Sequence, residues 1–102
     1  MFKFNGRWYF MNKSMTLVQI AESIRRFILE NYLFGIDSDE LSDNSSFLDL
    51  GILDSLGILE LIGFIEKEFG INVADTEILP ENLDSVEFAT SFVSRKTGHG
   101  GS

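Results

Sequence analysis

Apolar residues recur at helical spacing in the segment that follows Met15. Thr16 is followed three positions later by Gln19, a pair typical of the capping box that begins a helix. The apolar positions after Thr16 form one stripe, made of Leu17, Ile20, Ala21, Ile24, Phe27 and Ile28. Gly35 suits the helix end, because glycine tolerates the left-handed conformation found there. The pattern predicts a helix that begins directly after Thr16.

A second helical pattern runs from about Ser55 to Phe69 and is apolar over much of its circumference. We expect the inward face to consist of Leu56, Leu59, Ile62, Ile65 and Phe69, broadened by Ile58, Leu61 and Phe64. Gly70 ends the pattern. Gly57 and Gly63 inside the helix each cost about 1 kcal/mol relative to alanine, which suggests that another group approaches closely there. Such a helix is central to a bundle or partly exposed for binding.

The last helical pattern follows Asp84, which we expect to be its cap, with Glu87 at the capping-box position. Its apolar stripe is Val86, Ala89, Phe92 and Val93. Arg95 and Lys96 fall near its carboxyl end, where positive charge is favourable. A shorter helical turn is expected near residues 75–79.

Residues 36–54 read as a long acidic loop, and loops of this length are usually functional or disordered. The apolar residues expected to pin the loop to a core are Leu41, Phe47, Leu50, Ile52 and Leu53, and a short helical turn is expected at residues 46–50. Three substantial helices and one short helix predict an all-α fold, an antiparallel helix bundle. We assign the bundle to residues 16–97 and a flexible tail to residues 98–102.

The first 15 residues are basic and aromatic, unlike the acidic remainder. Asn5-Gly6 lies between two short aromatic runs and is typical of a type I′ turn in a hairpin. A lone two-stranded hairpin is marginal in water, so it would need to pack on the domain or on another copy of the chain. The simplest interpretation is an extension without function. Its aromatic residues could also mark a contact surface.

Composition and charge exclude several functions. The 102 residues include 16 acidic and 8 basic ones, for a net charge of −8, which disfavours a nucleic-acid partner and favours basic protein surfaces. Cysteine is absent and His99 is the single histidine, so thiol chemistry, most hydrolytic triads and histidine-based metal sites are excluded. No apolar run is long enough to span a membrane, and no signal peptide is evident. We expect a soluble, cytoplasmic protein with no metal site and no catalytic residue.

The remaining candidate for chemistry is Ser55, which lies at a loop-to-helix junction after Asp54. A helix N-terminus offers unpaired amides and a positive dipole, which suit a phosphate group. Capping by Asp54 or Ser55 alone would also explain these residue types, and spacing alone favours this explanation. The acidic residues Asp37, Asp39 and Asp43 fail the EF-hand spacing, because Leu41 and Leu48 occupy ligand positions.

The segment Phe47-Leu48-Asp49-Leu50-Gly51-Ile52-Leu53-Asp54-Ser55-Leu56 resembles the attachment site of acyl carrier proteins. The later Glu60-Leu61 and the run from Glu66 to Ile71 are similar to the second helix of that family. The resemblance extends from about Thr16 to Lys96. It implies an acyl-carrier-like four-helix bundle with one short helix.

The resemblance also implies a role for each matching residue. Ser55 would receive 4′-phosphopantetheine from coenzyme A through a Mg²⁺-dependent phosphopantetheinyl transferase, and the thiol of that arm would hold an acyl or aminoacyl thioester. Asp54 would belong to the transferase recognition site, and Leu56 would help to present the serine. The residues implied to face partner enzymes on the second helix are Glu60, Gly63, Glu66 and Lys67. Gly63 and Lys67 depart from the larger apolar residue and the acid usual in the family.

The resemblance leaves the cargo open. Asp54 before the serine suits acyl carriers, whereas Leu53-Asp54-Ser55-Leu56-Gly57 is also similar to D-alanyl and other stand-alone aminoacyl carriers. Implied partners are an acyl- or aminoacyl-activating ligase and the acyltransferases or synthases of lipid, polyketide or related biosynthesis. A pocket for the acyl group could be lined by Ile62, Ile65, Phe69, Phe27, Ile78 and Phe92, which are equally ordinary core residues. The alternative function is a small acidic helical module that binds a partner protein without a prosthetic group.

Overall fold

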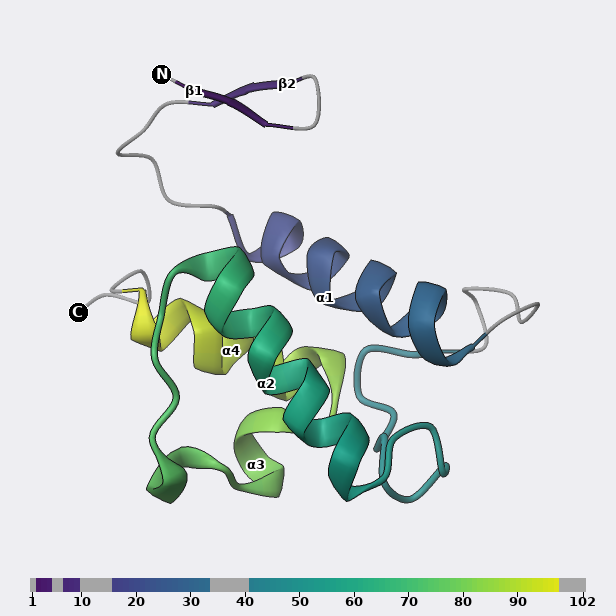
Figure 1. The fold of residues 1–102 in the computed structure, drawn as a ribbon. Helices are drawn as coiled ribbons and strands as arrows, with labels where there is room; N and C mark the ends of the chain where they lie inside the picture. The colour runs from purple at the N-terminus through teal and green to yellow at the C-terminus, as the bar shows by residue number, and fades with distance from the viewer. Residues whose placement is uncertain (1, 5–6, 10–15, 34–40, 98–102) are drawn as a thin grey trace.

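The computed structural model describes residues 2–4, 7–9, 16–33 and 41–97 (Figure 1). The helices are α1 (Leu17–Tyr32), α2 (Ser55–Phe69), α3 (Pro80–Leu83) and α4 (Val86–Lys96), with a 3₁₀ turn, η2, at Asp75–Glu77. Between residues 16 and 97, the described part of the chain is helical, with three longer helices and one short one. The predicted all-α bundle is therefore confirmed. No described helix is long and apolar enough to cross a membrane.

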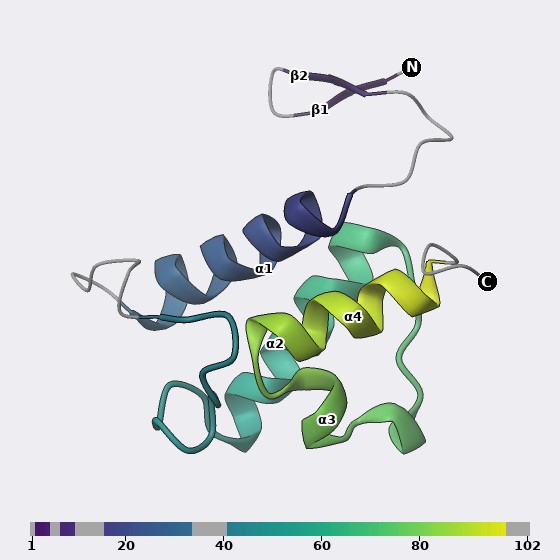
Figure 2. The ribbon, with the colours of Figure 1, turned by 180° about the vertical axis from the view of Figure 1, so that it is seen from behind.

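Two short strands precede the helices. β1 (Phe2–Phe4) and β2 (Arg7–Tyr9) pair antiparallel, with Phe2 opposite Tyr9 and Phe4 opposite Arg7. They flank the Asn5-Gly6 pair whose sequence favours a hairpin, although the turn residues themselves lie outside the described residues. In both views, the two strands stand apart from the helices (Figures 1 and 2).

Helix α1 begins as its sequence predicts. The Thr16 hydroxyl accepts a hydrogen bond from the Gln19 N–H at 3.2 Å, and the Gln19 side chain accepts one from the Thr16 N–H at 2.9 Å, so the capping box is confirmed. The helix ends at Tyr32, before Gly35, which lies outside the described residues. The predicted stripe is wrong at Leu17, which is 57% exposed because it borders an open space between the first turns of α1 and α4 instead of packed side chains.

The core joins the three long helices to the loop before α2. Its fully buried aliphatic residues include Ile20, Ile24 and Ile28 of α1. The loop contributes Leu41, Phe47 and Leu53, as predicted. Leu50, by contrast, is 60% exposed, because it lies in the turn that the Leu50 N–H closes on the Ser46 carbonyl. The turn expected at residues 46–50 is therefore present, but it turns Leu50 outward.

Helix α4 is capped one residue later than predicted. Ser85 has the extended backbone that a cap requires, and its hydroxyl accepts the Phe88 N–H at 3.0 Å. Asp84 has φ −88° and ψ 10° and ends α3 instead. The predicted stripe of α4 is buried, and Arg95 and Lys96 lie in its last turn. The four residues of α3 are too few for a periodic pattern, which explains why the sequence did not predict this helix.

Candidate functional site

Ser55 is the first residue of α2, and its neighbours fix the junction that presents it. Asp54 is the N-cap, with its carboxylate accepting a hydrogen bond from the Gly57 N–H at 2.8 Å. Gly57 is buried, and a Cβ atom there would lie 3.1 Å from a methyl group of Leu53. The close approach predicted for Gly57 is therefore present. At Gly63 there is none, because a Cβ atom would meet open space.

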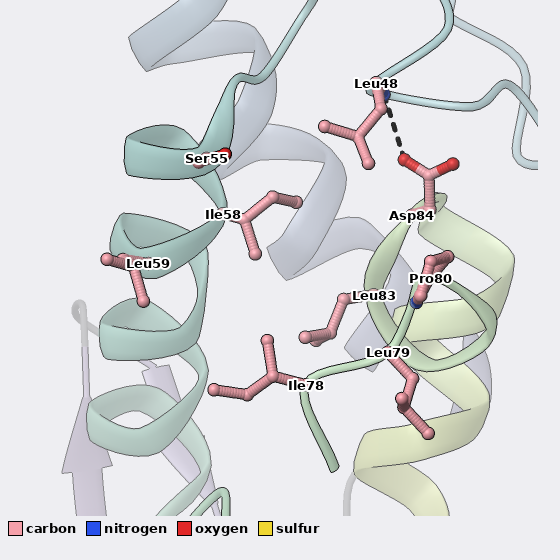
Figure 3. A pocket seen from close by; sticks show the side chains of 9 residues that line it. All are labelled: Leu48, Ser55, Ile58, Leu59, Ile78, Leu79, Pro80, Leu83 and Asp84. Carbon is pink, nitrogen blue, oxygen red and sulfur yellow. Dashed lines mark hydrogen bonds between the residues drawn. The ribbon is translucent and has the colours of Figure 1, made fainter. Parts of the chain in front are cut away.

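A cavity of about 340 Å³ opens beside Ser55, between α2 and the segment that leads into α4 (Figure 3). Its lining residues are Leu48, Ser55, Ile58, Leu59, Ile78, Leu79, Pro80, Leu83 and Asp84. Ile58, Ile78 and Leu83 converge on the space between the two walls (Figure 3). The volume falls within the range of roughly 300–1,000 Å³ that is typical of ligand pockets, and the walls are mostly apolar.

Asp84 holds the rim of this cavity together. One carboxylate oxygen accepts the Leu48 N–H at 2.9 Å (Figure 3). The other oxygen accepts the Ser46 hydroxyl. The backbone carbonyl of Asp84 accepts the Phe47 N–H at 2.8 Å. Three successive residues of the loop are thus tied to the end of α3, which keeps Leu48 over the cavity.

The exposed face of α2 differs from the prediction. Leu56 is 65% exposed and Leu59 is 56% exposed, whereas Leu61, Ile62 and Ile65 are buried. A helix that is apolar nearly all round gives little contrast between its faces, so its neighbours decide which face is buried. Of the six residues proposed for an acyl pocket, Ile78 lines the cavity, and Ile62, Ile65 and Phe92 belong to the core. The sequence pattern did not predict that Leu48, Pro80 and Asp84 line a pocket.

On its other side, α2 packs against α1 through aromatic side chains. We call Phe27, Tyr32, Phe64 and Phe69 the aromatic cluster. Phe27 and Phe64 stack at 4.4 Å between ring centroids, and Tyr32 and Phe69 meet these two rings edge-on. The Tyr32 hydroxyl donates a hydrogen bond to Glu60 of α2. Burial, this hydrogen bond and the negative charges of Glu60 and Asp54 raise the pKa of Tyr32 to about 12.

The four residues implied to face partners are not equivalent. Glu60, Gly63 and Lys67 are exposed along α2. Glu66 is partly buried, and its carboxylate accepts the Val73 N–H at 2.9 Å, so it holds the segment that follows α2. Gly70 ends α2, as predicted, and it has φ +67°, in the left-handed conformation.

Three comparisons with known proteins agree with this architecture. A family model described as "Phosphopantetheine attachment site" matches residues 33–89, more than half of the chain. The acyl carrier protein of Zymomonas mobilis subsp. mobilis is 36% identical over 73 residues, 72% of this chain and 88% of that protein. The acyl carrier protein of Solidesulfovibrio magneticus is 31% identical over 81 residues, 79% of this chain and 99% of that protein.

A solved structure described as "Crystal structure of FAD-dependent dehydrogenase" contains a chain that is 33% identical, with a TM-score of 0.61. The match covers 69% of this chain and 97% of that one.

The region that matches the family model contains Ser55 and every residue that lines the cavity beside it. The match indicates that the chain carries 4′-phosphopantetheine as a covalent cofactor, which sets aside the interaction module without a prosthetic group. The cofactor, the fold and the relatives agree: this chain belongs to the acyl carrier protein family and is a carrier of acyl groups rather than an enzyme.

Proposed function

We propose that Ser55 is the residue to which 4′-phosphopantetheine is attached. The observation that carries this proposal is that two adjacent residues have different roles at the start of α2. Asp54 caps the helix, so the Ser55 hydroxyl is not needed for capping and lies exposed at the mouth of the cavity. The unpaired amides at the helix start favour a phosphodiester at this position.

The other described serines between residues 33 and 89 are less suited to modification. Ser42 and Ser45 hydrogen-bond each other at 2.6 Å, and Ser46 donates to Asp84. Ser85 is 2% exposed and caps α4. Modifying any of these hydroxyls would break a contact that holds the loop or α4, whereas modifying Ser55 would break none of these contacts.

We assign Asp54 and Leu56 to the surface that a phosphopantetheinyl transferase recognises. Asp54 fixes the helix start through Gly57, and Leu56 is 65% exposed directly after the serine. Glu60, Gly63 and Lys67 extend this exposed face along α2 toward partner enzymes. Glu66 acts indirectly, by holding the segment after the helix through Val73.

We propose that the cargo is an uncharged acyl group rather than an aminoacyl group. When bound, the cofactor supplies a thiol that holds the acyl group as a thioester. The cavity beside Ser55 is lined mainly by aliphatic side chains, and Asp84, its one acidic residue, already accepts two hydrogen bonds. A buried ammonium group would lose its hydration without gaining a new partner there.

The proposed partners are a phosphopantetheinyl transferase that uses Mg²⁺, an acyl-activating ligase, and acyltransferases or synthases of lipid, polyketide or related biosynthesis, in the cytoplasm. One matched structure is described as an FAD-dependent dehydrogenase, so we also propose an enzyme of that class as a partner. The chain's net charge of −8 favours basic partner surfaces. Partner binding should therefore weaken as salt rises, and binding that is insensitive to salt would indicate mainly apolar contacts.

The attachment site can be tested by intact mass spectrometry. The purified protein is incubated with coenzyme A, Mg²⁺ and a phosphopantetheinyl transferase of broad specificity. We expect one phosphopantetheine to be added, and Ser55→Ala to abolish the addition. Ser91→Ala, which alters an exposed serine of α4, is the matched control and should be modified like the wild type. If folded Ser55→Ala were modified, or if several transferases failed on the wild type, the assignment of Ser55 would be wrong.

A further inference from the structure

A second cavity, of about 280 Å³, lies between α1 and α4. It is lined by Leu17, Val18, Ala21, Asp43, Val86, Glu87, Thr90 and Ser91, and it shares no lining residue with the cavity at Ser55. Its volume is just below the roughly 300–1,000 Å³ typical of small-molecule sites. A space of this size can hold one or two side chains of a protein segment.

Three kinds of group in the walls of this second cavity could gain a partner: exposed apolar side chains, a buried hydroxyl and a carboxylate. Leu17 and Val18 are 57% and 65% exposed, although both are large and apolar. Thr90 is only 7% exposed, and within the described residues its hydroxyl oxygen has no hydrogen-bond partner. Glu87 adds an exposed carboxylate at the rim, beside Asp43, whose own carboxylate is already paired with Arg25. An occupant should therefore bring apolar groups, a hydrogen-bonding group and positive charge.

The first residues of the chain have this chemistry. Residues 1–15 contain three basic residues, Lys3, Arg7 and Lys13, and no acidic one, whereas the rest of the chain contains all 16 acidic residues. Aromatic residues make up much of β1 and β2. A two-stranded hairpin is marginally stable alone, and its outer edges present unpaired N–H and C=O groups.

We propose that the hairpin of β1 and β2 docks on the cavity between α1 and α4 of its own chain. Leu17 and Val18, which line this cavity, belong to the first turn of α1, so the hairpin is tethered beside it. Seven residue-to-residue steps lead from Tyr9 to Thr16, and at about 3.3 Å per step they span up to about 23 Å. Because Leu17 and Val18 come directly after Thr16, the hairpin stays within this distance of the cavity wall.

The single tryptophan, Trp8, lies in β2 and reports on docking without a label. In the full chain, we expect Trp8 to be partly protected from acrylamide quenching. Val18→Asp should increase quenching and shift the emission to longer wavelength, because it introduces a third carboxylate into the cavity wall. Leu50→Asp is the matched control, since Leu50 is 60% exposed and lines neither cavity, and its quenching should equal that of the wild type.

A second variant leaves the helices untouched. Lys3→Glu combined with Arg7→Glu should release the hairpin and raise Trp8 quenching to the level of Val18→Asp. Equal quenching in the wild type and in both variants, with helical circular dichroism intact, would overturn the proposal. If protection of Trp8 in the wild type disappeared on dilution and sedimentation detected a dimer, a second copy would be the occupant and docking within one chain would be wrong. Attachment at Ser55 is measured separately by mass, so either proposal can fail without the other.

Discussion

Helix α2 meets its two neighbours in different ways. Toward α1, its side chains complete the aromatic cluster, with Phe27 and Phe64 stacked at 4.4 Å and Tyr32 bonded to Glu60. Toward the segment of α3, it borders a cavity of about 340 Å³ that begins at Ser55. The same helix is therefore filled on one side and hollow on the other.

The difference shows which side of α2 holds the helix in place and which side is available for cargo. Protein interiors are usually close-packed, and the loss of contacts across a void costs dispersion energy. The filled side holds α2, and with it Ser55, at a fixed place on α1. The hollow side gives up packing between α2 and α3, and we infer that an acyl group restores it.

The largest expected effect is a loss of stability when the packing between α1 and α2 is disrupted. Phe64→Ala removes the ring that stacks on Phe27, and we expect the free energy of unfolding to fall by about 3 kcal/mol. Leu59→Ala, on the hollow side and 56% exposed, should change it by less than about 0.5 kcal/mol. Chemical denaturation followed by circular dichroism measures both. Equal losses for the two variants would remove the distinction between the sides.

The second expected effect is a gain in stability when an acyl chain fills the cavity beside Ser55. An octanoyl thioester on the arm should stabilise the protein by about 2 kcal/mol, if roughly three methylene groups enter the cavity. An alanyl thioester is the matched control and should add little, because its ammonium group remains in water. Thermal unfolding of the two loaded forms makes the comparison. Equal stabilisation by both cargoes would contradict an acyl role for the cavity.

The third expected effect loosens the rim of the cavity. Asp84→Ala removes the acceptor of the Leu48 N–H and the Ser46 hydroxyl, and we expect a loss of about 1.5 kcal/mol in the free energy of unfolding. Hydrogen exchange at the Leu48 amide should accelerate at the same time. Glu81→Ala, which alters an exposed acidic residue of the neighbouring α3, should leave both measurements unchanged. Unchanged exchange at Leu48 in Asp84→Ala would show that the loop is held by other contacts.

Local signals in the sequence were sufficient to predict where α2 begins and ends. Gly70 ends α2 as predicted, and of the two candidate caps, Asp54 and Ser55, Asp54 is the cap. Each of these residues acts on its immediate neighbours in the chain. The buried face of α2 was not predictable, because apolar residues surround the helix and only its place in the shared core selects Leu61, Ile62 and Ile65.

Features that depend on distant segments were also missed. Asp84 and Ser85 are adjacent and both are good caps, so the choice between them depends on the hydrogen bonds that the loop makes to Asp84. The cavity is lined by residues 48, 55, 58–59, 78–80 and 83–84, which no periodic pattern connects. Ser55 could be identified as a candidate because its signal lies within a single short segment.

The smallest expected effect tests the hydrogen bond between α1 and α2. The pKa of Tyr32 is raised from 10.0 to about 12, so folding favours the protonated phenol, and this stabilisation is complete below pH 10 and lost as the pH rises toward about 12. Tyr32→Phe should cost about 1 kcal/mol near neutral pH, because Glu60 loses its donor. Its stability should then fall less steeply than that of the wild type between pH 10 and 12, since the variant lacks the shifted phenol.

Glu60→Gln is the informative control, because an amide oxygen still accepts the hydrogen bond without adding negative charge. Its stability near neutral pH should equal that of the wild type, and its loss of stability between pH 10 and 12 should be smaller. If Tyr32→Phe and the wild type lost stability in parallel above pH 10, the contact between Tyr32 and Glu60 would not hold the filled side of α2.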